Sequence, residues 1–371
     1  MSRELFIGMI SGTSRDGADV ALVRFTDDWP EVLEADCVPY PPDIATGLQE
    51  LVAARRRPTP EERIALDQPL ANHFSRAAIF LLEKAGVNPE EVTAIGSHGQ
   101  TVWHDPESEN PETIQLGNPE SIAKQTGIVT VGDFRQADMQ AGGQGAPLAP
   151  LLHRALFSPA IHSGSGRGAV LNLGGIANLS VLGISGSVSG FDTGPANCLM
   201  DAWIGANLNQ AFDRDGCWAA SGQVSTRLLK NMLSDPYFSK NAPKSTGIEY
   251  FNTAWLEQQL HGENLDAADV QATLAELTAV SVTDQIPRFS PAEVLVCGGG
   301  THNSHLMQRL QANLPSVPLR STATRGLDPD WIEAILFAWL ARERLAGRLL
   351  DTGSITGARE PMLLGKISQP G

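Results

Sequence analysis

Two short segments rich in glycine and small polar residues each separate a pair of apolar runs. They are "SGTSRDG" at residues 11–17 and "LGGIAN" at residues 173–178. Backbone N–H groups in tight turns form anion-binding concavities, and glycine lets a phosphate approach the backbone closely. Either turn alone also fits an ordinary hairpin with glycine at positive φ and an Asx turn. Two such turns at corresponding places favour a site that holds a nucleoside triphosphate between them.

Asp16, in the first of these turns, is a candidate for positioning Mg2+. Because Mg2+ keeps much of its hydration shell and takes few protein carboxylates, we expect Asp16 to hold it through water. The sequence has no GxxxxGK[ST] motif, which argues against a P-loop site. "CGGGTHN" at 297–303 follows an apolar run as a further nucleotide-binding turn would, but it is not GxGxxG. A close strand-to-helix packing turn is the alternative there.

An acidic residue, Asp192, stands between a predicted strand and a predicted helix in "GFDTGPANCLMDAW" at 190–203. Pro195 marks the start of the helix, so Asp192 or Thr193 can be a helix cap. The alternative is catalytic, because a carboxylate at a strand end beside bound phosphates is placed as a general base. In that case "TGPAN" brings the N-terminal amides of the helix close to the site.

Two polar loops, "GSHGQTVWHDP" at 96–106 and "DFRQADMQAGGQGAPLAP" at 133–150, each leave a predicted strand. Hydroxyl, amide, imidazole and guanidinium groups at strand ends suit a polyhydroxylated substrate that carries an acidic group. Arg135 is the candidate for binding that carboxylate. His98 and His104 lack a third ligand at a metal-binding spacing, so we expect no metal at these histidines.

The overall composition excludes several classes of protein. A chain of 371 residues that is 42% hydrophobic and 19% charged can bury a sizeable core. Its formal charge of -15 argues against binding nucleic acid or anionic lipid. The four cysteines show no zinc or redox spacing, which predicts reduced thiols in the cytoplasm. The longest apolar stretch, residues 334–341, is far shorter than the roughly 20 residues that cross a bilayer, and no signal-peptide pattern is present.

The predicted elements occur twice in the same order. Strands at 5–10, 19–25 and 31–40 precede helices at 44–56 and 58–86, and the strand–turn–strand pattern restarts at 168–183 and 187–195. Later helices surround a buried strand at 293–296. This order predicts a duplicated α/β unit with a cleft between the copies. We expect a first domain of residues 1–135 plus about 342–371, and a second of residues 136–341.

Eight segments together resemble those of the anhydro-N-acetylmuramic acid kinase family, and the resemblance covers essentially the whole chain. In order they are "SGTSRDGAD", "GSHGQT", "DFR" with "AGGQGAPLAP", "NLGGIANL", "FDTGPAN", "PKSTGIEYFN", "CGGGTHN" and "PDWIEAILFAWLA". The resemblance implies the fold of the acetate and sugar kinase, Hsp70 and actin superfamily. That fold is two duplicated actin-like (ribonuclease H-like) ATPase domains with a nucleotide cleft between them.

The resemblance also implies a reaction. Water opens the 1,6-anhydro bridge of the sugar at C1 while O6 takes the γ-phosphoryl group of ATP, giving N-acetylmuramic acid 6-phosphate and ADP. The expected setting is recycling of cell-wall sugar in the bacterial cytoplasm, by a homodimer that uses ATP and Mg2+.

Site residues carried over by the resemblance fall into three groups. Asp192 is the general base that deprotonates the attacking water. The residues expected to bind ATP are Ser11, Gly12, Thr13, Ser14, Arg15, Asp16, Gly17, Asp19, Gly174, Gly175, Asn178, Gly298, Gly299 and Gly300. The residues expected to bind the sugar are Ser97, His98, Gln100, Arg135, Asp138, Gly145 and Glu333.

The sequence departs from the family pattern at Arg15, where an apolar residue is expected, and at Ala196, where glycine is commoner. Two other functions stay open. A simpler sugar kinase of the same superfamily would use Asp192 to deprotonate a sugar hydroxyl, and a nucleotide-gated ATPase would hydrolyse ATP to change shape. The polar loops at 96–104 and 133–145 favour a sugar substrate over the second alternative.

Overall fold

The computed structural model divides the chain into two α/β units, the first of which is made from both ends of the sequence. This unit comprises Met1–Leu152 and Trp331–Gly371, and the second comprises His153–Asp330. The structure describes residues 4–371 apart from 13–14, 55, 163–166, 184–185 and 243. The sequence analysis placed the domain boundaries at residue 135 and at about residue 341. The first unit of the structure is larger, because it also includes residues 136–152 and 331–341.

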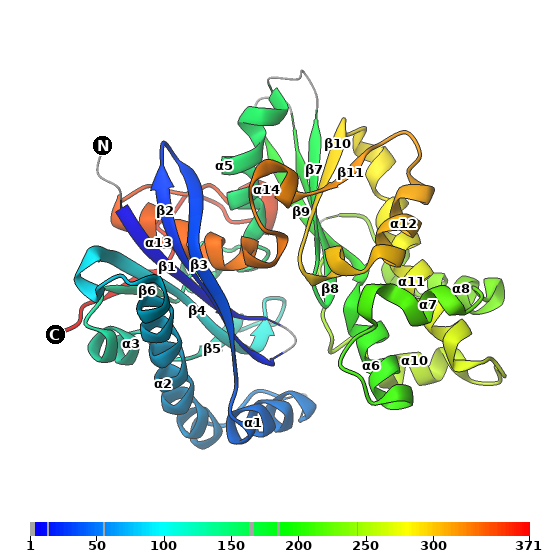
Figure 1. The fold of residues 1–371 in the computed structure, drawn as a ribbon, viewed down its shortest axis with the longest axis horizontal. Coiled ribbons are helices and arrows are strands. Elements are labelled where there is room, and N and C mark those ends of the chain that lie inside the picture. The colour runs from blue at the N-terminus through cyan, green and yellow to red at the C-terminus, as the bar shows by residue number, and fades with distance from the viewer. Residues whose placement is uncertain (1–3, 13–14, 55, 163–166, 184–185, 243) are drawn as a thin grey trace. The chain divides into compact units, whose positions relative to one another are not determined.

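A mixed sheet, with seven strands in the described part of the chain, forms the centre of the first unit (Figure 1). β1 (Glu4–Ser11) pairs antiparallel with β2 (Gly17–Thr26), which pairs antiparallel with β3 (Trp29–Pro39). On its other side β1 runs parallel to β4 (Val92–Asp105). The sheet is completed by β5 (Glu112–Leu116), antiparallel to β4; β6 (Thr130–Gly132), parallel to β4; and β12 (Lys366–Ser368), antiparallel to β6.

The longest helix of the first unit, α2 (Pro60–Ala85), packs on one face of this sheet. A capping box between Thr59 and Glu62 begins it, and Gly86 ends it in the left-handed conformation. Its Leu70 and Phe74 belong to a buried cluster with Ile7 of β1. The helical segments α1 (Pro42–Ala53), η1 (Pro89–Glu91), α3 (Pro119–Thr126), α4 (Gln136–Gln140) and α14 (Gly353–Thr356) also lie in this unit.

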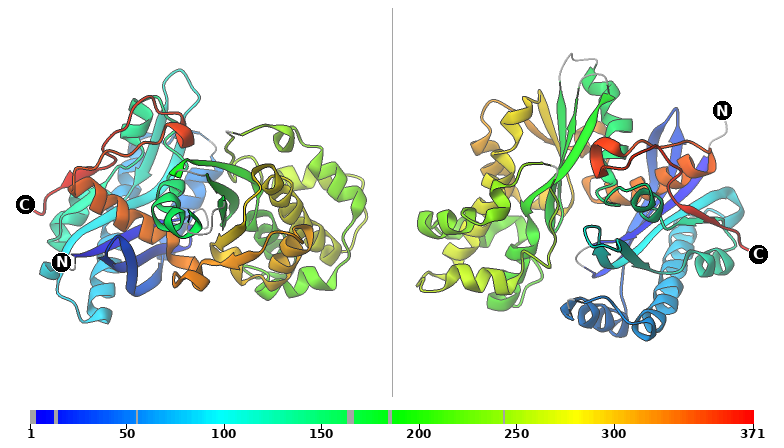
Figure 2. Two further views of the ribbon diagram at one scale, coloured as in Figure 1. Left: turned by 90° about the horizontal axis from the view of Figure 1, so that it is seen from above. Right: turned by 180° about the vertical axis from the view of Figure 1, so that it is seen from behind.

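The opposite face of the same sheet is covered by α13 (Ile332–Leu345), as Figures 1 and 2 show. Successive strand residues alternate between faces, so Gly8 of β1 points away from Ile7 and α2. A Cβ atom at Gly8 would lie 1.8 Å from the carbonyl oxygen of Ala334, and one at Gly96 of β4 would lie 1.9 Å from that of Phe337. These glycines let α13 lie directly on the sheet, which fixes the position of Glu333 in its first turn.

The second unit has its own mixed sheet, with five strands among the residues that the structure describes. β7 (Gly168–Leu173) pairs antiparallel with β8 (Ile176–Leu182), which pairs antiparallel with β9 (Val188–Pro195). β10 (Glu293–Cys297) runs parallel to β7 and to β11 (Leu319–Ser321).

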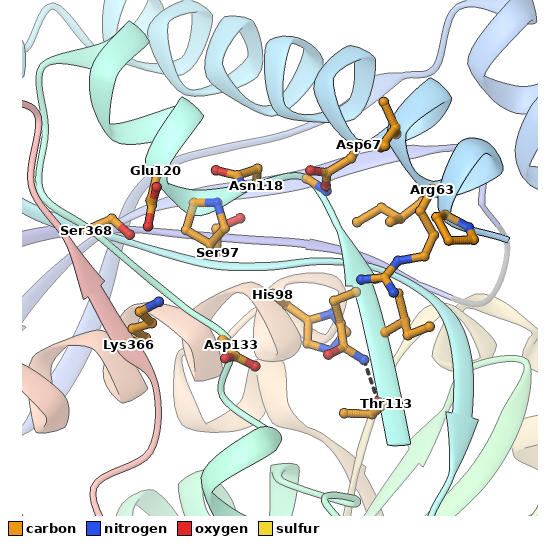
Figure 3. Close-up of a pocket in the computed structure, with 17 residues that line it drawn as sticks. Arg63, Asp67, Ser97, His98, Thr113, Asn118, Glu120, Asp133, Lys366 and Ser368 are labelled. Carbon is orange, nitrogen blue, oxygen red and sulfur yellow. Dashed lines mark hydrogen bonds between the residues drawn. The ribbon is translucent and has the colours of Figure 1, made fainter. Parts of the chain in front are cut away.

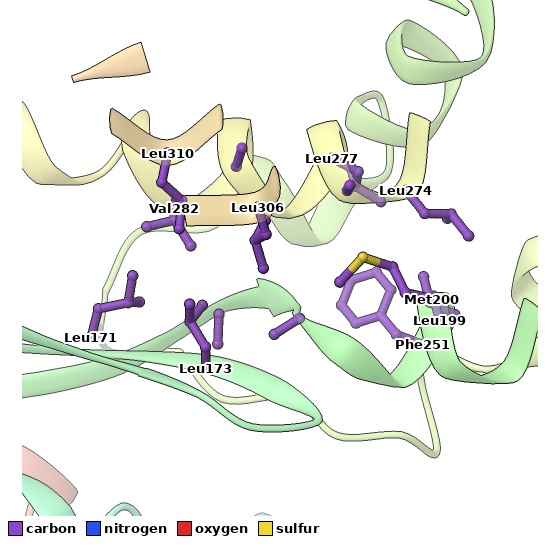
Figure 4. Close-up of a cluster of buried hydrophobic side chains, with 14 of the residues drawn as sticks. Leu171, Leu173, Leu199, Met200, Phe251, Leu274, Leu277, Val282, Leu306 and Leu310 are labelled. Carbon is purple, nitrogen blue, oxygen red and sulfur yellow. The ribbon is translucent and has the colours of Figure 1, made fainter. Parts of the chain in front are cut away.

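Helices pack on this second sheet through a large apolar cluster (Figure 4). Leu171 and Leu173 of β7 face Leu306 and Leu310, and Phe251 lies among the helices beside Met200. The helices are α6 (Asn197–Leu208), α7 (Cys217–Ser221), α8 (Thr226–Leu233), α9 (Pro236–Ser239), α10 (Thr253–Leu260), α11 (Ala267–Thr283) and α12 (Ser304–Asn313), and α5 (Ala149–His162) enters from the first unit. Shorter 3-10 turns are η3 (Arg214–Gly216), η4 (Ile286–Phe289), η5 (Gly299–His302), η6 (Thr322–Arg325) and η7 (Pro329–Trp331).

The two sheets share one strand order, which confirms the predicted duplication. Strands β3-β2-β1-β4-β6 correspond in order and direction to β9-β8-β7-β10-β11. The turn after β1 and the turn after β7 therefore occupy equivalent places in the two units. No helix in the described part of the chain is long and apolar enough to cross a membrane.

Candidate active site

Asp192 lies on β9, opposite Asn178 of β8, at a point where the ladder is irregular. The register changes between Ala177 and Asn178, so that Thr193 is the extra residue of a bulge. The Nδ2 group of Asn178 donates to Oδ1 of Asp192 at 2.9 Å, and the backbone N–H of Thr246 donates to Oδ2 at 3.0 Å. Two donors from different segments therefore fix the carboxylate, and Asp192 does not cap α6 with its side chain.

Burial raises the pKa of Asp192 from 3.8 to about 6. The hydrogen bonds from Asn178 and Thr246 oppose this shift, and the charge of Glu249 adds to it while that of Lys244 opposes it. The carboxylate is thus charged at neutral pH and more basic than an ordinary aspartate. This is the property that a general base requires.

The segment 235–255, of which the sequence analysis used only the family motif at 243–252, packs against Asp192 and supports it. The hydroxyl of Tyr237 donates to the carbonyl oxygen of Asp192 at 2.7 Å, and the N–H of Asp192 donates to the carbonyl oxygen of Lys244 at 3.0 Å. Asp235 accepts from the backbone N–H of Tyr237, the hydroxyl of Tyr250 and Nε1 of Trp255. The density of aromatic residues at 237–255 is the sequence signal that could have indicated this support.

The turn between β7 and β8 faces α6 with its carbonyl groups. The N–H groups of Ala196 and Cys198 donate to the carbonyl oxygen of Gly175, and that of Asn197 donates to Gly174. The helix amides that "TGPAN" was expected to bring to the site are therefore already engaged. Since C=O and N–H point in opposite directions across a trans peptide, the N–H groups of Gly175 and Ile176 point away from α6. Backbone N–H groups directed away from the helix are the groups that the predicted phosphate site requires.

The three glycines after β10 have different environments. A Cβ atom at Gly298 would lie 2.4 Å from Oδ1 of Asn172, and one at Gly300 would lie 2.6 Å from Cβ of Leu173. Both glycines are needed for close packing against β7, as the alternative interpretation of "CGGGTHN" proposed. A Cβ atom at Gly299 meets nothing within 4 Å, so Gly299 is the member of the set with space for a ligand.

The described residues of the first turn differ in the space around them and in their exposure to solvent. A Cβ atom at Gly12 would meet nothing within 4 Å, whereas one at Gly17 would lie 2.5 Å from the carbonyl oxygen of Val38. Arg15 is half-buried with φ of 54°, and its N–H donates to the carbonyl oxygen of Gly12. Asp16 is exposed, whereas Asp19 is half-buried on β2. Thr13 and Ser14 lie outside the described residues.

Gln100, a predicted sugar contact, makes its hydrogen bonds to protein groups near this turn. Its Oε1 accepts from the hydroxyl of Ser11 at 2.7 Å, and its Nε2 donates to the carbonyl oxygen of Thr101. The side chain is only 3% exposed. The Gln100 side chain therefore links β4 to the end of β1.

Arg135 is oriented by His98 and Gly145. Its Nε donates to Nε2 of His98 at 2.9 Å, and its Nη1 donates to the carbonyl oxygen of Gly145 at 2.8 Å. The Nδ1 atom of His98 is 3.0 Å from the carbonyl oxygen of Gly99, which fixes the neutral tautomer with its proton on Nδ1. Burial and the charge of Arg135 lower the pKa of His98, in agreement with this neutral state.

Asp138, a predicted sugar contact, makes its hydrogen bonds to protein groups. It has no exposed surface. Its Oδ1 accepts from the hydroxyls of Thr352 and Thr356, at 2.5 and 2.7 Å, and its Oδ2 accepts from the N–H of Gly145 at 2.7 Å. Asp138 thus fixes the loop that carries Gly145, and through Gly145 it helps to place Arg135.

Glu333 and Arg135 lie near one another without forming an ion pair in the described part of the structure. Burial raises the pKa of Glu333, and the charge of Arg135 opposes this shift. Burial likewise lowers the pKa of Arg135 to about 10, against the charges of Glu333 and Asp138. Two partly desolvated and opposite charges that are not paired to each other can both bind a polar ligand.

Ser97 and His98 line a cavity of about 530 Å³ in the first unit (Figure 3). The hydroxyl of Ser97 is buried, and it has no hydrogen-bond partner among the described residues. Further lining residues come from α2, β5, α3 and β12 and include Arg63, Glu120 and Lys366. A buried hydroxyl without a partner is costly unless a ligand or water satisfies it.

Comparison with known proteins identifies the family. The model of the family "Anhydro-N-acetylmuramic acid kinase" matches residues 4–370. The chain belongs to this family. A relative of that name from Xanthomonas oryzae pv. oryzae (strain MAFF 311018) is 47% identical over 368 residues, covering 98% of this chain and 97% of the relative. Another from Vibrio cholerae serotype O1 is 46% identical over 374 residues, covering 99% of each chain.

A solved structure agrees with the fold. The (R)-2-hydroxyglutaryl-CoA dehydratase component A of Acidaminococcus fermentans superposes with a TM-score of 0.50 at 13% identity, covering 92% of this chain and 99% of that chain. At this identity the likeness shows the fold alone, and it agrees with the duplicated α/β units of this anhydro-N-acetylmuramic acid kinase family member.

The acidic residues of this family member suit Mg2+ only as a partner of bound phosphates. Within the described ranges, no group of three or more His, Cys, Asp or Glu side chains could hold a metal ion. Asp16 is an exposed carboxylate beside the first turn. Because Mg2+ in nucleotide sites keeps several waters and takes few carboxylates, one such residue fits the ion.

Proposed function

We propose that the protein phosphorylates 1,6-anhydro-N-acetylmuramic acid at O6 with ATP while water opens the anhydro ring, giving N-acetylmuramic acid 6-phosphate and ADP. The observation that carries this proposal, beyond family membership, is the environment of Asp192. Its carboxylate is fixed by two donors and carries a raised pKa, as a base for water requires.

The chemistry needs one well-placed carboxylate. Water gives its proton to Asp192 as its oxygen bonds to C1, and the C1–O6 bond breaks. Hydrolysis of a glycosidic bond usually needs a second carboxyl group to protonate the leaving oxygen. Here O6 bonds to the γ-phosphorus of ATP instead, and the bond from that phosphorus to the bridging oxygen of ADP breaks.

For ATP, the equivalent turns after β1 and β7 are the proposed phosphate sites. Gly12, Gly174, Gly175 and Gly299 have backbone or space that a phosphate can approach, whereas Gly17, Gly298 and Gly300 act through packing. Mg2+ bound to the phosphates, with Asp16 in its outer shell, would neutralise their charge. Phosphoryl transfer depends mainly on such alignment and neutralisation.

For the sugar, Arg135, Glu333 and Ser97 are the proposed contacts. The Nη2 group of Arg135 makes no hydrogen bond to the described residues and is free to bind the lactyl carboxylate. Glu333 and the hydroxyl of Ser97 can bind sugar hydroxyl or amide groups. These contacts are held in place by hydrogen bonds within the protein that involve His98, Gln100, Asp138 and Gly145.

The family also suggests a cellular setting. We propose that the protein acts in the bacterial cytoplasm in the recycling of peptidoglycan, and that it forms a homodimer. No disulfide joins Cys37, Cys198, Cys217 or Cys297 in the described structure, which suits a reducing compartment.

A brief reaction in heavy-oxygen water tests the proposed coupling. The label should appear on C1 of the sugar phosphate and not in the phosphoryl group, and Asp192→Asn should lose turnover by about 100- to 10,000-fold while it keeps nucleotide binding. Labelled inorganic phosphate without a sugar product would indicate an ATPase instead. Label at C1 no higher than in product incubated in the same water would indicate an ordinary sugar kinase.

A further inference from the structure

Lys244 is a buried lysine in the second unit that forms no salt bridge with the described residues. It is 8% exposed. Its Nζ donates to the carbonyl oxygen of Tyr237 at 3.3 Å and lies 4.6 Å from the centroid of the Tyr237 ring. A buried ammonium without a carboxylate partner costs free energy, so its presence calls for a compensating interaction.

The contacts of Lys244 lead to Asp192 by two routes. The backbone carbonyl of Lys244 accepts the N–H of Asp192 at 3.0 Å. The tyrosine that holds the ammonium donates its own hydroxyl to the carbonyl oxygen of Asp192 at 2.7 Å. Two residues further along the chain, the N–H of Thr246 reaches the Asp192 carboxylate. Lys244 and Asp192 are therefore neighbours in one hydrogen-bonded unit.

We propose that Lys244 is a positioning residue for the reaction: its buried ammonium, held by Tyr237, keeps the Asp192 carboxylate charged and in place to accept a proton from water. This inference rests on the proposed role of Asp192 as the general base. It adds a second residue to that role, one that acts on the base through space and through Tyr237.

The charges around the pair support this assignment. Glu249 faces Asp192 and favours its protonated form, whereas Lys244 opposes that effect. Burial lowers the pKa of Lys244, the charges of Arg288 and Lys240 lower it further, and the charge of Asp192 raises it. Asn178 from β8 and the Tyr237 hydroxyl from α9 are the other groups packed on Asp192. Lys244 is thus a cation that favours the charged form of this carboxylate, and removing it leaves only the hydrogen bonds from Asn178 and Thr246 to oppose burial and the charge of Glu249.

Lys240 offers a matched control, because its Nζ lies over the same Tyr237 ring, 5.7 Å from the centroid, but its side chain is exposed. The experiment compares the pH dependence of kcat/KM for Lys244→Met, Lys240→Met and the unchanged protein. In Lys244→Met the acid limb should move to higher pH, so that the loss at pH 6 exceeds the loss at pH 8.5 by about fivefold for a limb moved by one unit from about pH 6. Lys240→Met should leave the limb where it is.

Two further variants separate position from charge. Tyr237→Phe keeps the ring beneath Lys244 but loses the hydroxyl, so kcat should fall without movement of the acid limb. Lys244→Arg keeps the charge and should restore the limb. If Lys244→Met does not fold, as judged by circular dichroism, Lys244→Gln takes its place with the same expectation, and failure of both to fold assigns Lys244 to structure and overturns the proposal.

The outcomes distinguish this inference from the proposed function. If Asp192→Asn stays active, the base assignment fails and the role of Lys244 fails with it. If Asp192→Asn is inactive while the Lys244→Met profile keeps the shape and limb of the unchanged protein, only the role of Lys244 fails. A raised KM for ATP with an unmoved limb would instead assign Lys244 to nucleotide binding.

Discussion

Replacing Asp192 by asparagine should stabilise the fold above neutral pH while it abolishes turnover. The folded-state pKa of about 6 lies above the ordinary value of 3.8. Between these two values the folded protein binds more protons than the unfolded chain, so stability falls as the pH rises through this window. At about 1.4 kcal/mol per unit, the shift of about two units corresponds to about 3 kcal/mol lost by pH 7.

The amide introduced by Asp192→Asn avoids this cost because it is never charged. Its oxygen can still accept from the N–H of Thr246. Its NH2 group needs an acceptor, and Oδ1 of Asn178 is buried without a partner in the described structure. Rotating the Asn178 amide by half a turn would present that oxygen to the introduced NH2 group. One buried polar atom remains unsatisfied before and after the change, so we expect little other loss.

Thermal unfolding between pH 4 and pH 8 measures this effect. The variant and the unchanged protein should unfold at similar temperatures near pH 4. The difference in favour of the variant should grow to several degrees by pH 8, at about 2–4 °C per kcal/mol. Asp138→Asn is the matched control, because its carboxylate accepts from three donors and an amide there must place its NH2 group against one of them. The control should be less stable at every pH, and a variant of Asp192 that unfolds earlier than the unchanged protein at pH 8 would refute the reasoning.

Two further predictions concern the substrate sites. Gly12→Val should raise the KM for ATP by about tenfold or more without lowering the unfolding temperature, since the position has open space. Gly298→Ala should instead lower the unfolding temperature, because its Cβ meets Asn172 and Leu173. An unchanged ATP affinity of Gly12→Val in calorimetry would show that the first turn is not part of the nucleotide site. Arg135→Lys should raise the KM for the anhydro sugar by about ten- to a hundredfold with ATP binding unchanged, because lysine loses the fork that donates to His98, Gly145 and a carboxylate; an unchanged KM would mean that Arg135 serves the fold alone.

Much of the fold was predictable because its signals are local. Alternating apolar runs and small-residue turns indicated β1, β2, β7 and β8, and Thr59 and Gly86 marked the ends of α2. The domain boundaries are set by long-range contacts, and no local signal shows that the whole of α13 packs on β1 and β4.

The sequence predicted which polar residues gather at the candidate site. It did not predict which of them make their hydrogen bonds to protein groups and which remain available to a ligand. Sequence indicated Gln100, His98 and Asp138 as polar residues at strand ends, and the structure shows each one with its polar atoms turned to protein groups. The support of Asp192 by Tyr237 and Lys244 comes from a segment 45 residues or more along the chain. The spacing of residues in the sequence cannot reveal such contacts, because the fold of the whole second unit brings these residues together.

The contacts of Asp138 determine when this part of the protein can fold during synthesis. Thr352 and Thr356 are separated from Asp138 by 214 and 218 positions, so a ribosome delivers the entire second unit before it releases the partners of this carboxylate. Forming a contact across so long a stretch of chain costs more entropy than forming a local contact. The loop around Arg135 is therefore fixed only after Asp138 has bound Thr352 and Thr356. A nascent or shortened chain can therefore contain the whole second unit before Asp138 and the proposed sugar contact Arg135 have all their hydrogen-bond partners. We expect proteolysis that removes Thr352 and Thr356 to impair the loop that carries Gly145 without unfolding the second unit, which carries Asp192.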